Sequence, residues 1–377
     1  MLATAGSRPS LKVIADVSEF DKIQVSWDDF VAKSGANWYF HGESVRAQMV
    51  RCRSQGGIPL AVLKLSEGHI VGVCAFEIRR RFGLRYSGFL LSSIFLPDFL
   101  VVPEHSQSFV EQSLDFLLLR MKCRVVTLVF PKGSPQAAAS KTYCARKGMR
   151  LTVKEVEKHS VLLVDGVWKD FERRRGSNFR NHFKKIESKL TEIGPWRLVQ
   201  AKANSPESIS KITTVERNSW KHEGTKERLS GLPDLDRGIL RYTSYRGSES
   251  KDDLCPRVWF LELQNTPIAY AITVESNGVA FLAKTSYDNR YRNLYPGEYV
   301  QNETIRSFVD SRLVSRIDFM ALLPYHRRWT SWWEDKEEMR ISRRGLPFAM
   351  LEVSVRMFRN AKRLGAGLFS FPRRALC

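Results

Sequence analysis

The chain has 377 residues, of which 43% are hydrophobic and 27% are charged. This balance excludes a disordered chain, and the length exceeds what one ordinary hydrophobic core requires. The sequence holds 60 Lys and Arg against 40 Asp and Glu, so its formal net charge is +20. Such a charge favours an anionic partner, which is a coenzyme, a nucleic acid or an anionic membrane surface.

The six cysteines are scattered singly, without a CxxC pair or the spacing of metal ligands. This pattern predicts reduced thiols in a reducing cytoplasm rather than a disulfide framework. The seven histidines show no HxH or HExxH pattern, so we predict no metal site. The N-terminal residues lack the apolar core of a signal peptide, and the longest apolar run, 89–102, is interrupted by Pro97 and Asp98. We therefore expect a soluble, cytoplasmic protein.

The first half of the chain alternates helix and strand signals. The polar turn 66–68 separates two β-rich runs and indicates a hairpin. The predicted helices are 43–54, 106–121 and 134–146, and the predicted strands are 58–65, 70–77, 85–95, 124–130 and 159–164.

A basic helical segment connects the halves. Residues 168–190 carry eight basic and three acidic side chains, a charge of +5, and their apolar residues can form one face. Gly176 and Ser177 could divide the segment into two helices.

The second half repeats the pattern of the first. A helix at 205–220 opens with Ser205 and Pro206, which are good cap and first-turn residues. A basic loop closing on Pro296-Gly297 then leads into another helix. The predicted strands are 196–201, 257–264, 268–275, one ending at Asp318-Phe319, 339–342 and 348–353. Both halves run helix, β-meander, strand, helix, strand, which indicates a duplicated α/β architecture.

Five short motifs of the second half stand in a fixed order. The first is the basic helix FRNHFKKIESKL at 179–190, the second is Glu216-x-x-Ser219-Trp220-Lys221, and the third is Pro267-Ile268-Ala269. The fourth consists of Lys284, Tyr287, Asp288, Tyr291, Pro296 and Gly297. The fifth is Asp318-Phe319 followed by Tyr325 and Trp329. In this order they resemble the GNAT-superfamily acetyltransferase domain of CelD/BcsL-like proteins, a group associated with cellulose and exopolysaccharide biosynthesis. The resemblance covers residues 168–335 and is distantly shared with the Fem peptidoglycan aminoacyl transferases.

The chain departs from this family at two places. Ala321-Leu322-Leu323 stands where the family usually has a glycine, and His326 replaces a lysine. If that lysine contacts a ligand, His326 is expected to supply a weaker, titratable charge.

The resemblance implies an α/β fold with two tandem GNAT-like domains, each a mixed, mostly antiparallel sheet flanked by helices. We expect an N-terminal GNAT-like domain at 1–167, the basic connector at 168–195, a C-terminal acyltransferase domain at 196–355 and a basic tail at 356–377.

The loop before the helix at Pro296-Gly297 is the candidate cofactor-binding site. A helix N-terminus offers free N–H groups and a partial positive charge, which suit a phosphate-bearing ligand. Arg290 and Arg292 could add forked donors. The alternative is an ordinary strand-to-helix turn. The resemblance implies acetyl-CoA or another acyl-CoA as donor, and this prediction requires an open corner with both arginines facing a cavity.

Three side chains are the catalytic candidates and five the substrate-binding candidates. Asp318, Tyr287 or Lys284 could handle a proton, and Asp318 is expected to lie beside Asp288 if their strands are neighbours. The alternative roles are solvation at strand ends, capping of a turn and, for tryptophan, core packing. The substrate-binding candidates are Trp220, Lys221, Asp288, Tyr325 and His326.

The function implied by the resemblance is an N- or O-acyltransferase in which an amine or hydroxyl of a sugar or cell-envelope precursor attacks an activated acyl group directly. Proximity and oxyanion stabilisation would then dominate catalysis. The first alternative is a Fem-like transferase with an aminoacyl-tRNA donor, which the charge of +20 suits. The second is a non-catalytic scaffold in polysaccharide assembly.

The C-terminal residues 340–377 carry nine Lys or Arg and one acidic residue, Glu352, a charge of +8. With interleaved Phe and Leu, this segment could lie on an anionic membrane surface, which would place the protein at the inner membrane. The alternative is a solvated basic face with a frayed terminus.

Overall fold

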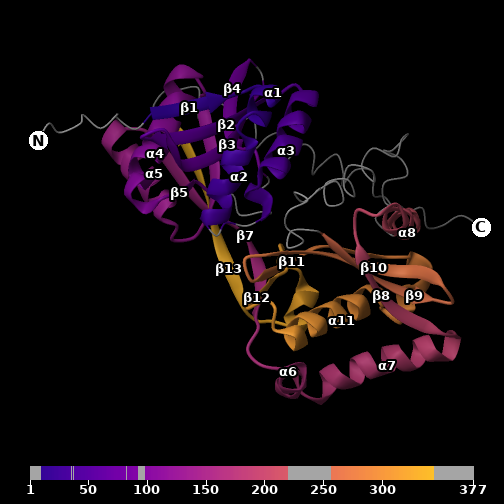
Figure 1. Cartoon of the computed structure of the whole chain (residues 1–377). Helices are drawn as coiled ribbons and strands as arrows, with labels where there is room; N and C mark the ends of the chain where they lie inside the picture. The colour runs from indigo at the N-terminus through magenta and orange to yellow at the C-terminus, as the bar shows by residue number, and fades with distance from the viewer. Residues whose placement is uncertain are drawn as a thin grey trace, which may run out of the picture.

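The computed structural model describes residues 10–34, 36, 38–81, 83–91, 98–219 and 256–343. The predicted strand 348–353, the basic tail, Trp220 and Lys221 lie outside these ranges. Figure 1 shows two α/β halves, with strand β13 (Trp333–Ser342) running from the second half into the first. In the part of the chain that the structure describes, no helix is long and apolar enough to cross a membrane.

The first half consists of seven strands and the helices around them. The strands are β1 (Ser10–Ile14), β2 (Ile58–Ser66), β3 (His69–Arg81), β4 (Leu84–Phe89), β5 (Leu100–Val101), β6 (Val125–Pro131) and β7 (Arg150–Leu163). The helices are α1 (Val17–Asp21), α2 (Gln24–Lys33), η1 (Trp38–Phe40), α3 (Gly42–Ser54), η3 (Pro103–His105), α4 (Ser106–Asp115), the π-helical turn η4 (Phe116–Arg120) and α5 (Pro135–Lys147).

The second half begins with the basic connector. Its helices are α6 (Trp168–Arg175), α7 (Ser177–Ile193), α8 (Pro206–Arg217), η6 (Asn289–Leu294), α11 (Pro296–Ser311) and η7 (Pro324–Arg328). Its strands are β8 (Trp196–Lys202), β9 (Arg257–Leu263), β10 (Thr266–Ser276), β11 (Val279–Tyr287) and β12 (Arg316–Asp318).

Local sequence signals explain where several helices begin and end. Ser205 caps α8 by accepting a hydrogen bond from the amide of Ser208, and Pro206 occupies the first turn. The connector divides at Gly176, whose φ of 83° lies in the left-handed region that favours glycine. The predicted break between two connector helices is therefore confirmed.

Strand pairing shows the duplicated architecture. In the first half β2, β3 and β4 are antiparallel neighbours, and β6 then pairs with β4 in parallel. In the second half β9, β10 and β11 are antiparallel neighbours, and β12 pairs with β11 in parallel. The helical segments α4–η4 and α11 precede the respective parallel strands. Each sheet is therefore mixed and mostly antiparallel, as predicted.

Two long strands join the halves. Strand β13 comes from the range predicted for the C-terminal domain, yet it is hydrogen-bonded between β6 and β7 of the first sheet. The end of β7 also pairs with β12, through Val161 opposite Asp318. The strands therefore follow one order from β1 to β8 through both halves.

Three buried clusters fill the layers. Helices α4 and α5 cover one face of the first sheet, and their cluster includes Met339 and Ile341 of β13. Helices α6, α7 and α11 cover one face of the second sheet. The third cluster joins α1–α3 to α8, β10 and Phe281, so it spans both halves. The hydrophobic core is thus shared between the halves rather than divided at the connector.

Candidate functional site

A cavity of about 830 Å³ opens where β11 and β12 separate. The two strands pair for only three residues, from Val279 opposite Arg316 to Phe281 opposite Asp318. The residues that follow on both strands, 282–285 and 319–321, line the cavity together with Tyr325, His326 and residues of the first sheet. Ligands of open α/β sheets bind beyond the carboxyl ends of the strands, where neighbouring strands separate.

A β-bulge lies in the wall of this cavity. Ile272 pairs with Lys284 and Thr273 pairs with Leu282, which leaves Ala283 as the extra residue on β11. Bulges redirect backbone groups and are frequent beside active sites. The bulge was not predicted, because the segment contains neither glycine nor proline.

The cavity is predominantly basic. Its lining contains two acidic residues, Glu155 and Glu338, and five basic ones, Lys154, Lys158, Lys284, Lys336 and Arg340. All of these except Lys284 belong to β7 or β13, so the first sheet supplies most of the charge. This wall could not be read from the sequence, because it depends on β13 entering the first sheet.

Some basic side chains of the wall form ion pairs with nearby carboxylates, and one does not in the part of the chain that the structure describes. Lys158 pairs with Asp335 at 2.7 Å, and Arg340 pairs with Glu338 at 2.7 Å. Lys154 is exposed and has no ion-pair partner within the described ranges. It is therefore a cation available to an anionic ligand.

Lys284 connects three of the motifs that carry the family resemblance. Its Nζ lies 3.4 Å from Oε1 of Glu216, and the Tyr270 hydroxyl donates a hydrogen bond to the same oxygen. Glu216 is the last buried residue of α8, and Tyr270 lies on β10. Three motifs distant in sequence thus meet at one buried carboxylate beside the cavity.

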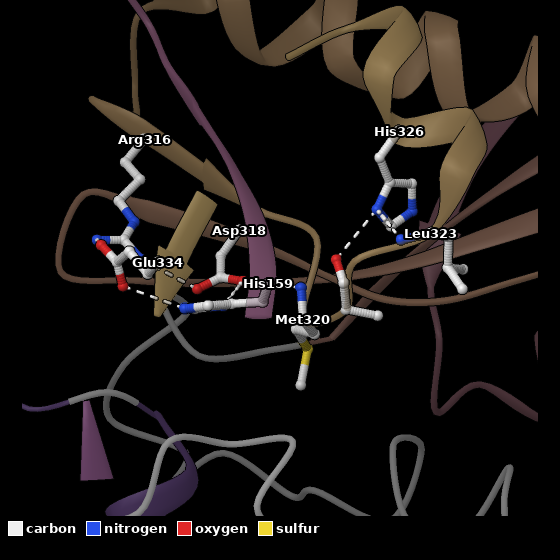
Figure 2. Close-up of polar contacts among 8 residues, drawn as sticks. His159, Arg316, Asp318, Met320, Leu323, His326 and Glu334 are labelled. Atoms are coloured by element: carbon white, nitrogen blue, oxygen red, sulfur yellow. Dashed lines mark hydrogen bonds and ion pairs between the residues drawn. The ribbon is translucent and has the colours of Figure 1, made fainter. Parts of the chain in front are cut away.

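His326 lines the cavity from η7 and is only 3% exposed. Its Nδ1 lies 3.1 Å from the carbonyl oxygen of Ala321 and 3.4 Å from the amide nitrogen of Leu323, as Figure 2 shows. A carbonyl oxygen only accepts, so the shorter contact favours a proton on Nδ1 and a free lone pair on Nε2.

Burial lowers the pKa of His326 to about 4. The imidazole is therefore neutral at pH 7, because desolvation disfavours its charged form. The prediction that His326 supplies a charge in place of the family's lysine is wrong. A neutral nitrogen base lines the cavity instead.

Asp318 is placed differently from the prediction. It is 3% exposed and is not among the residues that line the cavity. Its Oδ1 contacts Nδ1 of His159 at 2.9 Å and accepts from the amide of Met320 at 2.7 Å, while Oδ2 accepts from Arg316 at 3.2 Å. Both oxygens are engaged, so the structure supports a positioning role.

Asp318 and three other side chains, His159, Glu334 and Arg316, form a closed ring of contacts (Figure 2). Nε2 of His159 contacts Glu334 at 3.1 Å, and Arg316 donates to Glu334 at 2.5 Å. Burial opposes a charge on His159, but hydrogen bonds to Asp318 and Glu334 outweigh burial and raise its pKa. The hydrogen bond from His159 lowers the pKa of Glu334 to about 2. The ring thus places an imidazole and a guanidinium against two carboxylates.

The ring determines the course of the loop that lines the cavity. Met320 adopts φ of 56°, a left-handed conformation that the bond from its amide to Asp318 stabilises. The loop is also hydrogen-bonded to Ser160 of β7, through Phe319 N–H and Ala321 carbonyl. The carbonyl oxygen of Ala321 contacts Nδ1 of His326, so residues 318–321 connect the ring to the imidazole.

The expected proximity of Asp318 to Asp288 is wrong. Asp318 lies opposite Phe281 of β11, and Asp288 follows Phe281 by seven residues, just after β11 ends at Tyr287. At about 3.3 Å per residue, these carboxylates are about 20 Å apart along the strand direction. Asp288 caps η6 and is buried.

The predicted phosphate corner is not among the lining residues of the cavity. Arg290 is ion-paired with Asp288 at 2.6 Å and its side chain is 65% exposed, while Arg292 is exposed. Pro296 and Gly297 begin α11 as predicted, but both are buried. A Cβ on Gly297 would lie 2.9 Å from Cδ1 of Tyr287, so this ring packs against the first turn.

Of the predicted site residues, the structure therefore brings Lys284, Tyr325 and His326 to the cavity. Gln301 of α11 also lines it and is 2% exposed. A polar residue on the buried face of a predicted helix is the signal that could have identified it. Within the described ranges, no group of His, Cys, Asp and Glu could hold a metal ion.

Comparison with known proteins supports the fold. Residues 177–344 match the family model of the acetyltransferase (GNAT) domain. No curated protein sequence matches the chain.

Three solved structures superpose on most of the chain. FemX shares 9% identity with a TM-score of 0.58, covering 90% of this chain and 99% of that chain. A conserved protein from Bacteroides thetaiotaomicron shares 8% identity with a TM-score of 0.54, covering 88% and 99%. The C-terminal domain of a protein described as a lysylphosphatidylglycerol synthetase from Agrobacterium fabrum shares 12% identity with a TM-score of 0.52, covering 90% and 95%.

Identities this low show the fold alone. The fold is α/β, with two halves of the same strand pairing, and the family model that matches residues 177–344 supports a transferase of acyl groups. The finer resemblance to CelD/BcsL-like proteins is not confirmed.

Proposed function

We propose that the chain transfers an acyl group from acyl-CoA to an amine or hydroxyl of an acceptor in the cavity between β11 and β12. The observation that carries this proposal is the cavity itself, which opens within the GNAT-matched residues and has a basic wall. A sugar or cell-envelope precursor is the acceptor class that the sequence resemblance favours.

The donor would place its acyl end beside the bulge at Ala283 and its phosphates towards the basic groups. Lys154 supports this arrangement, because it lines the cavity and has no ion-pair partner within the described part of the chain. Arg292, which is exposed beyond the end of β11, is proposed to contact the remaining phosphates, whereas the first turn of α11 is covered by Tyr287 and is not part of the proposed donor site. Arg290 would contribute less, since Asp288 already neutralises it.

The acceptor would attack the acyl carbon directly, and its proton would pass to Nε2 of His326. The neutral imidazole, with Nδ1 held by Ala321, supports this role. Lys284 and the backbone N–H groups of the bulge would stabilise the oxyanion, and the thiolate of the donor would leave. Tyr325, 37% exposed at the cavity, would contact the acceptor.

Donor binding is tested by thermal shift and calorimetry with CoA, acetyl-CoA and longer acyl-CoA species. A ligand that binds only the folded state raises the melting temperature. Lys154→Gln and Arg292→Gln should each weaken donor binding by about tenfold, as expected for loss of a charge-assisted hydrogen bond. Lys12→Gln on β1, at the far edge of the sheet, is the charge-matched control and should bind normally.

The chemical step is tested by His326→Asn. The asparagine amide can replace Nδ1–H as a donor to Ala321, but it lacks the base at Nε2. We expect unchanged donor affinity and a turnover rate lower by about 10²–10⁴-fold. Failure of every acyl-CoA species to bind would remove the donor assignment. Full turnover by the variant would instead remove only the role of His326.

A Fem-like aminoacyl-tRNA donor is the second candidate, favoured by the fold shared with FemX and by the charge of +20. It predicts tRNA binding that weakens steeply with salt, together with no saturable acyl-CoA binding. Binding of neither donor would favour the non-catalytic scaffold.

A further inference from the structure

We propose that the first half carries a second anion site, separate from the cavity, that binds a phosphate group. The site is a hollow of about 380 Å³ between the β3–β4 hairpin and the segment that follows η4. It is lined by Gly83, Leu84, Arg85, Arg120, Lys122 and Arg124. Strands β6, β13, β7 and β12 separate β4 from β11, so this hollow is distinct from the proposed acyl-transfer site.

The hollow concentrates positive charge without compensation. Of the six described residues that line it, four are basic and none is acidic. Among the described residues, none of these four cations has an ion-pair partner, whereas Arg79, Lys158 and Arg340 of the first sheet each have one. Cations gathered in a concave surface raise the local concentration of anions.

The framework of the hollow is rigid. Arg85 donates a hydrogen bond to the carbonyl of Met121 at 3.0 Å, and the amide of Arg124 donates to the carbonyl of Arg85 at 2.8 Å. These bonds join the hairpin to the segment after η4. Arg85 is thereby oriented, and its remaining guanidinium N–H groups are available to an anion.

Two further features of the backbone and the strand register support the assignment. Arg80 lies directly opposite Arg85 across the β3–β4 pair, and like charges in this position destabilise a sheet. Lys122 adopts φ of 55°, an uncommon conformation for a lysine. The repulsion between Arg80 and Arg85 and the uncommon backbone conformation of Lys122 both occur beside the hollow. A bound anion would offset the repulsion between the arginines.

The ligand class is a phosphate monoester or diphosphate, because forked guanidinium groups and a lysine match phosphate oxygens. The same chemistry occurs in a soluble phosphate compound and in an anionic lipid headgroup. The test therefore has two arms, calorimetry with inorganic phosphate and pyrophosphate, and co-sedimentation with phosphatidylcholine vesicles with or without phosphatidylglycerol.

The test variant is Arg120→Gln/Lys122→Gln/Arg124→Gln, in which all three changed side chains are exposed. The matched control is Lys184→Gln/Lys185→Gln/Lys189→Gln on α7, where the three side chains are also exposed and the charge change is the same. We expect the hollow variant to weaken binding by about tenfold or more, and the α7 variant to bind as the wild type does.

The outcomes separate the two sources of the ligand. If the hollow variant, unlike the α7 variant, loses binding of phosphate or pyrophosphate but keeps vesicle binding, the ligand is a soluble phosphate compound. If it loses vesicle binding but keeps binding of phosphate and pyrophosphate, the ligand is a lipid headgroup. Absence of binding in both arms, or equal loss in the α7 variant, would overturn the proposal. Arg80→Gln adds an independent readout, because it should raise the melting temperature without phosphate and reduce the stabilisation that phosphate provides.

Discussion

At the scale of single residues, two buried histidines have opposite environments. His159 lies between two carboxylates that outweigh the effect of burial and raise its pKa. His326 contacts backbone groups of Ala321 and Leu323 and no carboxylate among the described residues, so burial lowers its pKa to about 4. Burial alone therefore does not decide the charge of a histidine, and the partner of each ring nitrogen does.

His326 should make the protein sensitive to acid. Because its folded pKa lies below the unfolded value, the unfolded state binds more protons between pH 6.5 and about 4. We expect the free energy of unfolding of the wild type, relative to His326→Asn, to fall in this window by on the order of 3 kcal/mol. Above pH 6.5 the difference between the two should be constant.

Urea unfolding at a series of pH values measures this effect. If the difference in unfolding free energy between the wild type and His326→Asn stays constant down to pH 4, the imidazole is not buried in its neutral form. His105→Asn is the control, because this histidine lies at a surface turn and is part-exposed.

The ring around Asp318 should contribute to stability through coupling. In Asp318→Asn, His159 keeps only Glu334 as a carboxylate partner, and Arg316 loses one of its two carboxylate partners. Removal of one partner from a buried charged pair costs about 3–5 kcal/mol. A double-mutant cycle with His159→Gln should give a coupling energy of about 1–3 kcal/mol, measured by urea unfolding.

The same cycle should separate positioning from catalysis. Because the ring orients the loop that carries Ala321, Asp318→Asn is expected to lower turnover while the pH profile of turnover keeps its shape. A shifted pH profile would indicate that Asp318 itself exchanges a proton with the substrate. Additive effects on stability would contradict the closed ring.

At the scale of elements, β11 and α11 form the corner on which the sequence interpretation depended. The strand ends at Tyr287, η6 follows with Asp288 as its cap, and α11 begins at Pro296. The elements lie where their local signals predicted. Their side chains are not placed as predicted, because Tyr287 packs against Gly297 and Arg290 forms an ion pair with Asp288.

Gly297→Ala tests the packing of this corner. The added methyl group would lie 2.9 Å from the ring of Tyr287, so the ring or the helix must shift. We expect a loss of about 1–3 kcal/mol of unfolding free energy, as for other overpacked sites. In a Tyr287→Ala background the same change should be neutral or stabilising by up to ~1 kcal/mol, because alanine favours a helix over glycine.

Thermal and urea unfolding of the four variants gives the comparison. Equal destabilisation in both backgrounds would show that the contact with Tyr287 does not account for the glycine.

At the scale of the whole molecule, β13 makes the two halves one cooperative unit. It follows the second half in sequence but runs into the first half (Figure 1). There it is hydrogen-bonded between β6 and β7, and its Met339 and Ile341 are fully buried. The cluster that contains Phe281 extends from the N-terminal helices into the second sheet. Neither half is therefore expected to unfold alone.

Ile341→Ala should destabilise the molecule as a whole. A buried isoleucine truncated to alanine costs about 2–5 kcal/mol. Hydrogen exchange should accelerate in β10 and β11 as well as in β6, because the mutation acts on one global transition. Val153→Ala on the same sheet is the control, since Val153 is 43% exposed and should change stability by less than about 0.5 kcal/mol. Faster exchange confined to the first sheet would contradict a single unit.

The sequence by itself determined many of the helices and strands and the duplicated order of strands, although β1, α2 and β5 were not predicted. The apolar periodicity around α7, the Ser205-Pro206 start of α8 and the break at Gly176 are local signals, and local backbone energetics decide them. The motif around Lys284 also located one wall of the cavity.

The tertiary structure alone decided the opposite wall and the chemistry of the site. The contribution of Lys154 and Arg340, the engagement of Asp318 by His159 and the neutral state of His326 depend on contacts between residues more than a hundred positions apart, or on burial. Strand pairing and desolvation arise from which segments become neighbours, and a linear pattern does not specify these neighbours.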